Sequence, residues 1–130
     1  MSSGNLLHKP ITKSIIGAFY RVHNSLGFGF LEQVYVSALE RALREAGHGV
    51  AREYAVRVYY EGQDVGFHRL DLLVDDVVIV EVKSTSELPG IAKRQLYNYL
   101  NATNLEVGLL LHFGPSPKFH RVLCARLPKC

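Results

Sequence analysis

The sequence predicts an α/β or α+β fold in which three helices flank a mixed sheet of about five strands. Apolar residues recur at helical spacing up to about residue 46, and beyond residue 50 they alternate as strands require. A further helical segment then separates the predicted strands, which favours a mixed sheet covered by helices. The expected order is α-α-β-β-β-α-β-β. The 130 residues should form a single domain, 1–130, with residues 1–9 as a flexible amino-terminal arm.

Two helices are expected in the first part of the chain, at residues 10–26 and at about 30–46. Pro10 suits a first helical turn, and Gly27 follows the last apolar residue of the first stripe. Gly47 ends the second stripe in the same way. The apolar stripes are formed by Ile11, Ile15, Ile16, Phe19, Val22 and Leu26, and by Leu31, Val34, Tyr35, Ala38, Leu39, Ala42 and Leu43.

The second part of the chain predicts five strands and one helix. Residues 54–60, 66–74 and 77–84 read as a three-stranded meander, because only short turn segments separate them. Residues 91–102 have helical spacing and follow the break at Pro89-Gly90. Residues 106–113 and 119–127 read as the last two strands.

Composition excludes several classes of protein. No apolar run approaches the roughly 20 residues that span a bilayer, so we expect a soluble protein with no membrane partner. The two cysteines, Cys124 and Cys130, form no CxxC pair, which argues against a disulfide framework or a structural zinc site and favours the cytoplasm. The net charge of +3 supports a polyanionic partner only weakly.

Three charged residues stand in segments that otherwise have the composition of a buried sheet. They are Asp71, Glu81 and Lys83. Glu81 and Lys83 share one face of a strand, because side chains two apart point the same way. Two carboxylates can hold a hard cation such as Mg²⁺, and a lysine beside them can stabilise charge on a phosphate. The competing interpretation of Glu81 and Lys83 is an ordinary pair of charges on a solvated strand.

The length of the predicted hairpin loop decides whether the two carboxylates can meet. A two-residue loop would place Asp71 and Glu81 on opposite faces of the sheet. A three-residue loop, Asp75–Val77, pairs Val74 with Val78, and the same register pairs Asp71 with Glu81. We therefore predict an odd-length loop or a bulge. This register also gathers one apolar face, which burial favours independently. That face comprises Leu70, Leu72, Val74, Val78, Val80 and Val82.

The Asp, the ExK strand and the helix that follows resemble the PD-(D/E)XK nuclease superfamily. Residues 29–35, Gly-Phe-Leu-Glu-Gln-Val-Tyr, match the motif of its small GxxExxY proteins, and the resemblance covers about residues 11–126. It implies a restriction-endonuclease-like core in which Asp71, Glu81 and the backbone carbonyl of Val82 bind the metal. Lys83 takes the place of the family's lysine. Arg69-Leu70 stands where the superfamily's name has a proline before the aspartate.

Three further residues match family positions and are expected in the same cleft. The resemblance gives Glu32 as the acidic residue of the first core helix, and it gives Gln95 and Tyr99 as a QxxxY pair on one helical face. Glu32 could instead be a carboxylate favoured by the helix dipole, and the pair could be helix surface and core. His68 is left out of the predicted site, because strand alternation places it on the face opposite Asp71.

The resemblance implies a metal-dependent nuclease with Mg²⁺ as cofactor and Mn²⁺ as its substitute. The expected substrate is nucleic acid, with DNA favoured, in repair, recombination or defence. One alternative is a catalytically inactive module that retains the fold and binds nucleic acid, and another is a subunit that only contacts other proteins. Because a small domain commonly needs a second subunit to span a duplex, a homodimer is also expected.

Overall fold

The computed structural model describes residues 7–124 and has the predicted order of elements. The helices are α1 (Lys9–Leu26), α2 (Glu32–Glu45) and α3 (Ala92–Asn101). The strands are β1 (Val50–Tyr60), β2 (Gln63–Val74), β3 (Val78–Lys83), β4 (Val107–Phe113) and β5 (Pro117–Leu123). The predicted α+β class is confirmed. No helix within residues 7–124 is long and apolar enough to cross a membrane.

Two predictions at the chain ends fall partly beyond these residues. Most of the expected amino-terminal arm, residues 1–6, lies outside the described part of the chain, as do residues 125–127 of the last predicted strand. Within the described part, the carbonyl of Leu7 accepts a hydrogen bond from Arg121 of β5. Helix α1 then begins at Lys9, with Pro10 in its first turn as expected.

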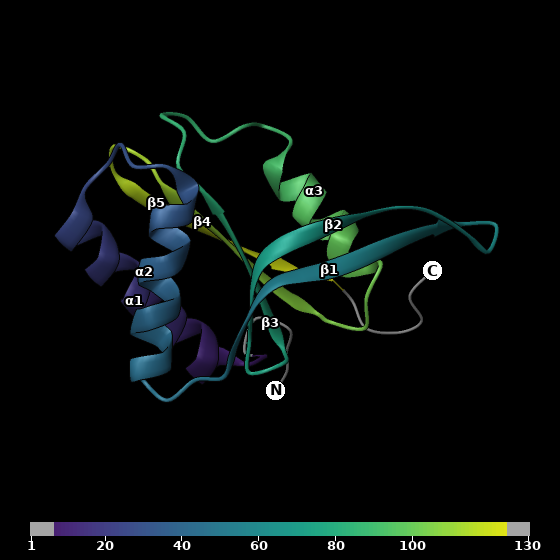
Figure 1. Cartoon of the computed structure of the whole chain (residues 1–130), viewed down its shortest axis with the longest axis horizontal. Helices are drawn as coiled ribbons and strands as arrows, with labels where there is room; N and C mark the ends of the chain where they lie inside the picture. Colours follow the sequence, from purple (N-terminus) through teal and green to yellow (C-terminus); the bar gives the residue numbers. More distant parts are fainter. Residues whose placement is uncertain (1–6, 125–130) are drawn as a thin grey trace.

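The five strands form one sheet in the order β1-β2-β3-β4-β5. Only β3 and β4 run parallel, and α3 is the crossover between them. Helices α1 and α2 cover one face of the sheet and α3 covers the other (Figure 1). The carboxyl end of β3 therefore lies between the start of α2 and the start of α3.

Each face of the sheet has its own core. Under α1 and α2, the buried ring of Phe113 stacks on Tyr35 at 4.3 Å and meets the edge of Phe19 at 4.8 Å between ring centroids. On the other face, Leu96 and Leu100 of α3 pack onto Gly108 of β4. A side chain at Gly108 would lie 3.1 Å from Leu96, so the glycine lets α3 approach the sheet closely.

At Glu53 of β1 and Asp71 of β2, the alternation of side chains between the two faces of the sheet is interrupted in both strands, which we call the face exchange. The ladder pairs Arg52 with Leu72 and Tyr54 with Leu70, and Glu53 between them has a φ of 55°. A left-handed residue rotates the strand and interrupts the alternation of side chains. Leu72 consequently packs under α1 and α2, whereas Leu70 packs under α3. The predicted apolar face is therefore correct for its other five members and wrong for Leu70.

The outer ends of β1 and β2 project from the sheet as a two-stranded arm (Figure 1). We call residues 57–67 the hairpin arm. Its register shifts between Val58 and Tyr59, opposite Gly66, whose φ is 151°. Tyr59, Tyr60, Val65 and Phe67 remain exposed on it.

Candidate active site

The turn between β2 and β3 sets the register of the site. Asp75 and Asp76 have φ values of 52° and 62°, and the N–H of Val77 donates to the carbonyl of Val74 at 3.1 Å. Val74 pairs with Val78 and Leu72 with Val80. The predicted three-residue loop is therefore confirmed. One step further along this register lies the pair formed by Asp71 and Glu81.

Asp71 and Glu81 each accept a backbone hydrogen bond from the other's strand. The N–H of Asp71 donates to Oε1 of Glu81 at 3.1 Å, and the N–H of Val82 donates to Oδ2 of Asp71 at 2.7 Å. Only 9% of Glu81 is exposed. The register and these bonds hold both carboxyl groups at one buried point.

Burial and mutual repulsion perturb the charge of this pair. Burial raises the pKa of Asp71 to about 7, and the negative charge of Glu81 adds to the rise. Burial also raises the pKa of Glu81. The hydrogen bond from the N–H of Asp71 and the charge of Lys83 oppose this rise, because they favour the ionised form of Glu81. Two carboxyl groups this close disfavour each other's ionisation. The positive charge of Lys83 therefore does not outweigh the effect of burial on either pKa.

Lys83 and Glu32 complete the charged cluster. The positive charge of Lys83 acts on both strand carboxyl groups and on Glu32. Glu32, at the first position of α2, accepts a hydrogen bond from the backbone N–H of Ser84. Burial raises the pKa of Glu32, and the charge of Lys83 opposes that rise. Glu32 thus lies beside Lys83 at the end of β3.

Tyr35 fixes the loop that delivers Glu32. Its hydroxyl donates to the carbonyl of Gly27 and accepts the N–H of Phe30 at 3.2 Å, while its ring is fully buried. Gly27 and Gly29 have positive φ values of 73° and 120°, which favour glycine. The loop before α2 is therefore held at both ends, which explains the glycine and the tyrosine that flank Glu32 in its motif.

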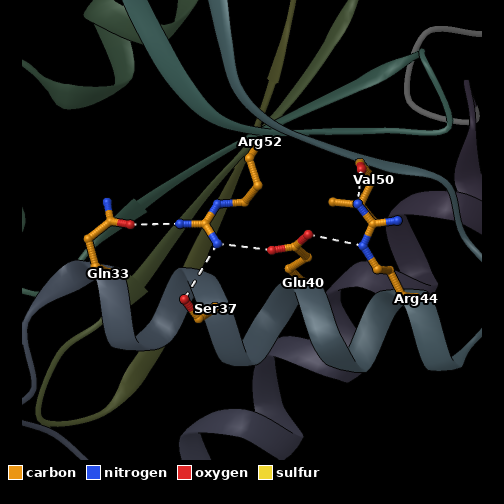
Figure 2. Close-up of polar contacts among 6 residues, drawn as sticks. All are labelled: Gln33, Ser37, Glu40, Arg44, Val50 and Arg52. Carbon is orange, nitrogen blue, oxygen red and sulfur yellow. Dashed lines mark hydrogen bonds and ion pairs between the residues drawn. The ribbon is translucent and has the colours of Figure 1, made fainter.

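A second set of contacts, spread along α2 from Gln33 to Arg44, holds this helix against β1 (Figure 2). The guanidinium of Arg52 donates to Gln33 at 2.7 Å and to Glu40 at 2.9 Å. Glu40 in turn accepts a hydrogen bond from Arg44, which also reaches the carbonyl of Val50. Hydrogen bonding from Arg52 lowers the pKa of Glu40, so this pair stays ionised at neutral pH. These contacts fix the turn of α2 that carries Glu32.

Helix α3 closes the other side of the site. A pocket of about 120 Å³ is lined by Glu81 and Lys83 together with Gln95 and Tyr99. His68 lines it as well, with its ring stacked on Tyr99 at 4.7 Å and its Nε2 3.2 Å from Oε2 of Glu81. The expectation that strand alternation places His68 away from Glu81 is therefore wrong. The face exchange at Glu53 reverses the alternation on which that expectation rested.

The donors at this point suit a hard divalent cation. The site offers the carboxylates of Asp71 and Glu81 and the nearby backbone of Val82, which are oxygen donors of the kind Mg²⁺ prefers. Within residues 7–124, no three acidic, histidine or cysteine side chains are arranged to hold a metal ion together. Glu32 is therefore placed beside Lys83 rather than as a third ligand.

Comparisons with known proteins bear on the family and the fold of the chain. Residues 9–122 match the family model of the PD-(D/E)XK nuclease superfamily. No curated protein matches the chain. Among solved structures, the crystal structure of SSO0001 is similar, with a TM-score of 0.58 and 19% sequence identity over 75% of this chain. The match covers 52% of SSO0001, so this chain spans about half the length of that protein. At this identity the likeness shows a shared fold.

Proposed function

Because the chain belongs to the PD-(D/E)XK nuclease superfamily, we propose that it is a metal-dependent nuclease that hydrolyses phosphodiester bonds, with DNA as its substrate. The observation that carries this proposal is the buried pair of Asp71 and Glu81, whose pKa values are raised and beside which Lys83 supplies a positive charge. Nucleases of this superfamily typically use divalent metals.

In the proposed site, Asp71, Glu81 and the carbonyl of Val82 would hold Mg²⁺, with Mn²⁺ as its substitute. A cation bound there would lower the pKa of a water and offset charge on the phosphate. In the hydrolysis, a water adds across one P–O bond, so that its hydroxyl bonds to phosphorus and its proton goes to the departing oxygen. The ammonium of Lys83 would orient that water and stabilise the charge that develops on the phosphate oxygens. Glu32, at the start of α2, interacts electrostatically with Lys83.

Gln95, Tyr99 and His68 line the same pocket from the side of α3 and β2. We propose that the Gln95 amide and the Tyr99 hydroxyl donate hydrogen bonds to the substrate next to the scissile phosphate. His68 stacks on Tyr99 and approaches Glu81, so it links the substrate-facing helix to the carboxyl pair. A homodimer that spans a duplex is compatible with this chemistry and is tested by measuring the mass of the protein in solution.

The proposal is tested by incubating the protein with single-stranded, duplex and branched DNA and with RNA, each with Mg²⁺, with Mn²⁺ and with chelator. We expect cleavage only with metal. Asp71→Ala and Glu81→Ala should lose metal binding measured by calorimetry. Lys83→Ala should bind metal and lose about 10²-fold in rate, if its charge acts in the transition state. Lys93→Ala, on the exposed side of α3, is the matched control.

Full activity in chelator, or an unchanged rate in the Lys83 variant, would refute this assignment. The second candidate is a module that keeps the fold and binds nucleic acid without cleaving it. The hydrogen bonds that already occupy Oδ2 of Asp71 and Oε1 of Glu81 favour it, since a metal must share those oxygens. Binding of DNA with no cleavage under any metal condition would support it.

A further inference from the structure

A groove of about 490 Å³ lies between the hairpin arm and α3, outside the catalytic pocket. Its walls come from the inner part of the arm and from the carboxyl-terminal end of α3 with the segment that follows. The polar and aromatic side chains in these walls are those of Arg57, Tyr59, Asn98, Asn101, Thr103 and Asn104. A volume of this size lies in the range of sites for small ligands, so it accommodates one or two nucleotides and is too small for a double helix.

A third hollow along α3 lies next to both the groove and the catalytic pocket. This hollow is lined by Gln95 and Tyr99, which also line the pocket, and by Asn98 and Ala102, which also line the groove. Gln95 and Asn101 are six residues apart on one helix, so the track along α3 is roughly 9 Å long. One nucleic-acid strand advances about 3.4 Å per stacked nucleotide, so this length corresponds to two or three nucleotides.

The charge of the groove suits a polyanion. Arg57 is the one charged side chain among the described residues that line the groove and the hollow. It forms an ion pair with Asp64 at 2.8 Å, and Asp64 itself is not part of the lining. The amides of the asparagines can donate and accept hydrogen bonds at base edges. Side chains can reach all the hydrogen-bonding edges of a base only when that base is unpaired.

The hairpin arm adds aromatic surface beside this charge. Tyr59 is 61% exposed and Phe67 is 47% exposed. The guanidinium groups of Arg57 and Arg69 lie over the ring of Phe67 at 5.0 Å and 5.1 Å from its centroid. Exposed rings next to arginines are the surface on which unpaired bases stack.

We propose that the groove between the hairpin arm and α3 binds unpaired nucleotides that flank the phosphodiester in the catalytic pocket, so that the substrate carries a single-stranded segment. This inference rests on the proposed function and specifies its substrate. The strand passes from the pocket along Gln95, Tyr99 and Asn98. Arg57 then contacts its phosphate, and Tyr59 stacks on a base.

The test measures binding of the full chain to labelled oligonucleotides by fluorescence anisotropy in chelator, so that no cleavage occurs. The probes are a 10-nucleotide oligothymidylate and a 20-base-pair duplex. We expect tighter binding to the single strand. Asn98→Asp should weaken that binding at least about fivefold through repulsion of phosphate. Arg57→Gln should reduce the slope of log K against log salt by about 0.7, as for one lost phosphate contact on a single strand.

Matched controls lie on the other side of the molecule. Asn24→Asp changes an exposed helical asparagine of α1, and Arg41→Gln removes an arginine that is paired with Glu45, as Arg57 is with Asp64. Both should bind the single strand within about twofold of the unaltered protein. Thermal unfolding of every variant checks that it is folded.

The outcomes separate this inference from the proposed function. Hydrolysis of a p-nitrophenyl phosphodiester of one nucleotide, too short to fill the groove, reports on the catalytic pocket alone and should be the same in the unaltered protein and in the control variant Asn24→Asp. If no metal supports that hydrolysis, the proposed function fails while the binding result still decides the groove. Equal binding of duplex and single strand, or affinities that Asn98→Asp and Arg57→Gln leave unchanged, would overturn the inference. So would a change of oligomeric state in Arg57→Gln, because the arm would then be a contact between two copies.

Discussion

Two aspartates near the end of β2 lie four residues apart and have opposite electrostatic surroundings. Burial raises the pKa of Asp71 to about 7, and the negative charge of Glu81 adds to the rise. Burial also disfavours the charge of Asp75, but hydrogen bonds from His48 and from the N–H of Gly49 outweigh it and lower the pKa. Identical side chains on one hairpin therefore differ in whether their charge is compensated.

Asp75, whose charge is compensated, belongs to a set of contacts formed by Ser14, His48 and Asp75, which we call the latch. His48 lies 2.6 Å from Oδ2 of Asp75 through Nδ1 and 2.7 Å from Oγ of Ser14 through Nε2. Hydrolases use the same three residue types in the same order, but neither the catalytic pocket nor the groove is lined by any of them. The contacts instead tie α1 and the segment before β1 to the turn that sets the register of Asp71. The latch holds in place the turn between β2 and β3. The pair of Asp71 and Glu81, whose charge is not compensated in this way, is available for catalysis.

The largest expected difference between the two aspartates is in activity. Asp71→Asn removes one of two carboxylates from the proposed metal site and should reduce metal-dependent cleavage at least about 10³-fold. Asp75→Asn changes only the latch and should keep cleavage within about threefold. Single-turnover rates at saturating Mg²⁺ measure both. Comparable losses in the two variants would show that the turn, and not the charge of Asp71, controls the reaction.

The sequence predicted the meeting of Asp71 and Glu81 because the evidence for it is local. Side chains alternate along a strand, and a three-residue loop satisfies both the apolar face and the carboxyl pair. His68 and Leu70 were misplaced because Glu53 adopts a left-handed conformation without being a glycine or an asparagine. No residue type marks that position. The latch of Ser14, His48 and Asp75 was likewise missed, since it joins segments that are distant in the sequence.

The stability of the metal-free protein should depend on pH in the direction set by Asp71. Its pKa in the folded state, about 7, lies above the ordinary value of 3.8 for an aspartate, so the folded state binds the extra proton. The proton on Asp71 should therefore make its full contribution to the free energy of unfolding below about pH 4. This contribution should decline as the pH rises toward 7. A shift of this size corresponds to at most about 4 kcal/mol. Urea unfolding in chelator at pH 5 and pH 8 measures it.

Divalent cation should reverse this loss, because its charge compensates the ionised pair. The increase in melting temperature caused by Mg²⁺ should be larger at pH 8 than at pH 5.5, where Asp71 is protonated. In Asp71→Asn the effect of Mg²⁺ should be absent at both values. An equal increase at both pH values in the unaltered protein would contradict the assignment of Asp71 as a ligand.

The two Asp→Asn variants should also change stability with opposite signs. At pH 8 without metal, Asp71→Asn removes an uncompensated charge and keeps an oxygen for the N–H of Val82, so the free energy of unfolding should rise. Asp75→Asn weakens charge-assisted hydrogen bonds to His48 and Gly49 and should lower it by about 1 to 2 kcal/mol. Chemical unfolding of both variants beside the unaltered chain tests this. Two changes of the same sign would contradict the comparison.

The smallest expected effect concerns the backbone, which is strained at both ends of this region. Glu53, opposite Asp71, and Asp76, next to Asp75, have φ values of 55° and 62°. Glycine adopts such values without the steric cost that other residues bear, so Glu53→Gly should raise the free energy of unfolding by about 0.5 to 1 kcal/mol. Asp76→Gly should raise it less, because aspartate tolerates the left-handed region better than glutamate does. Cleavage should stay unchanged in both variants, since neither side chain lines the catalytic pocket. Destabilisation by Glu53→Gly would contradict the steric cost that we assign to the left-handed conformation of Glu53.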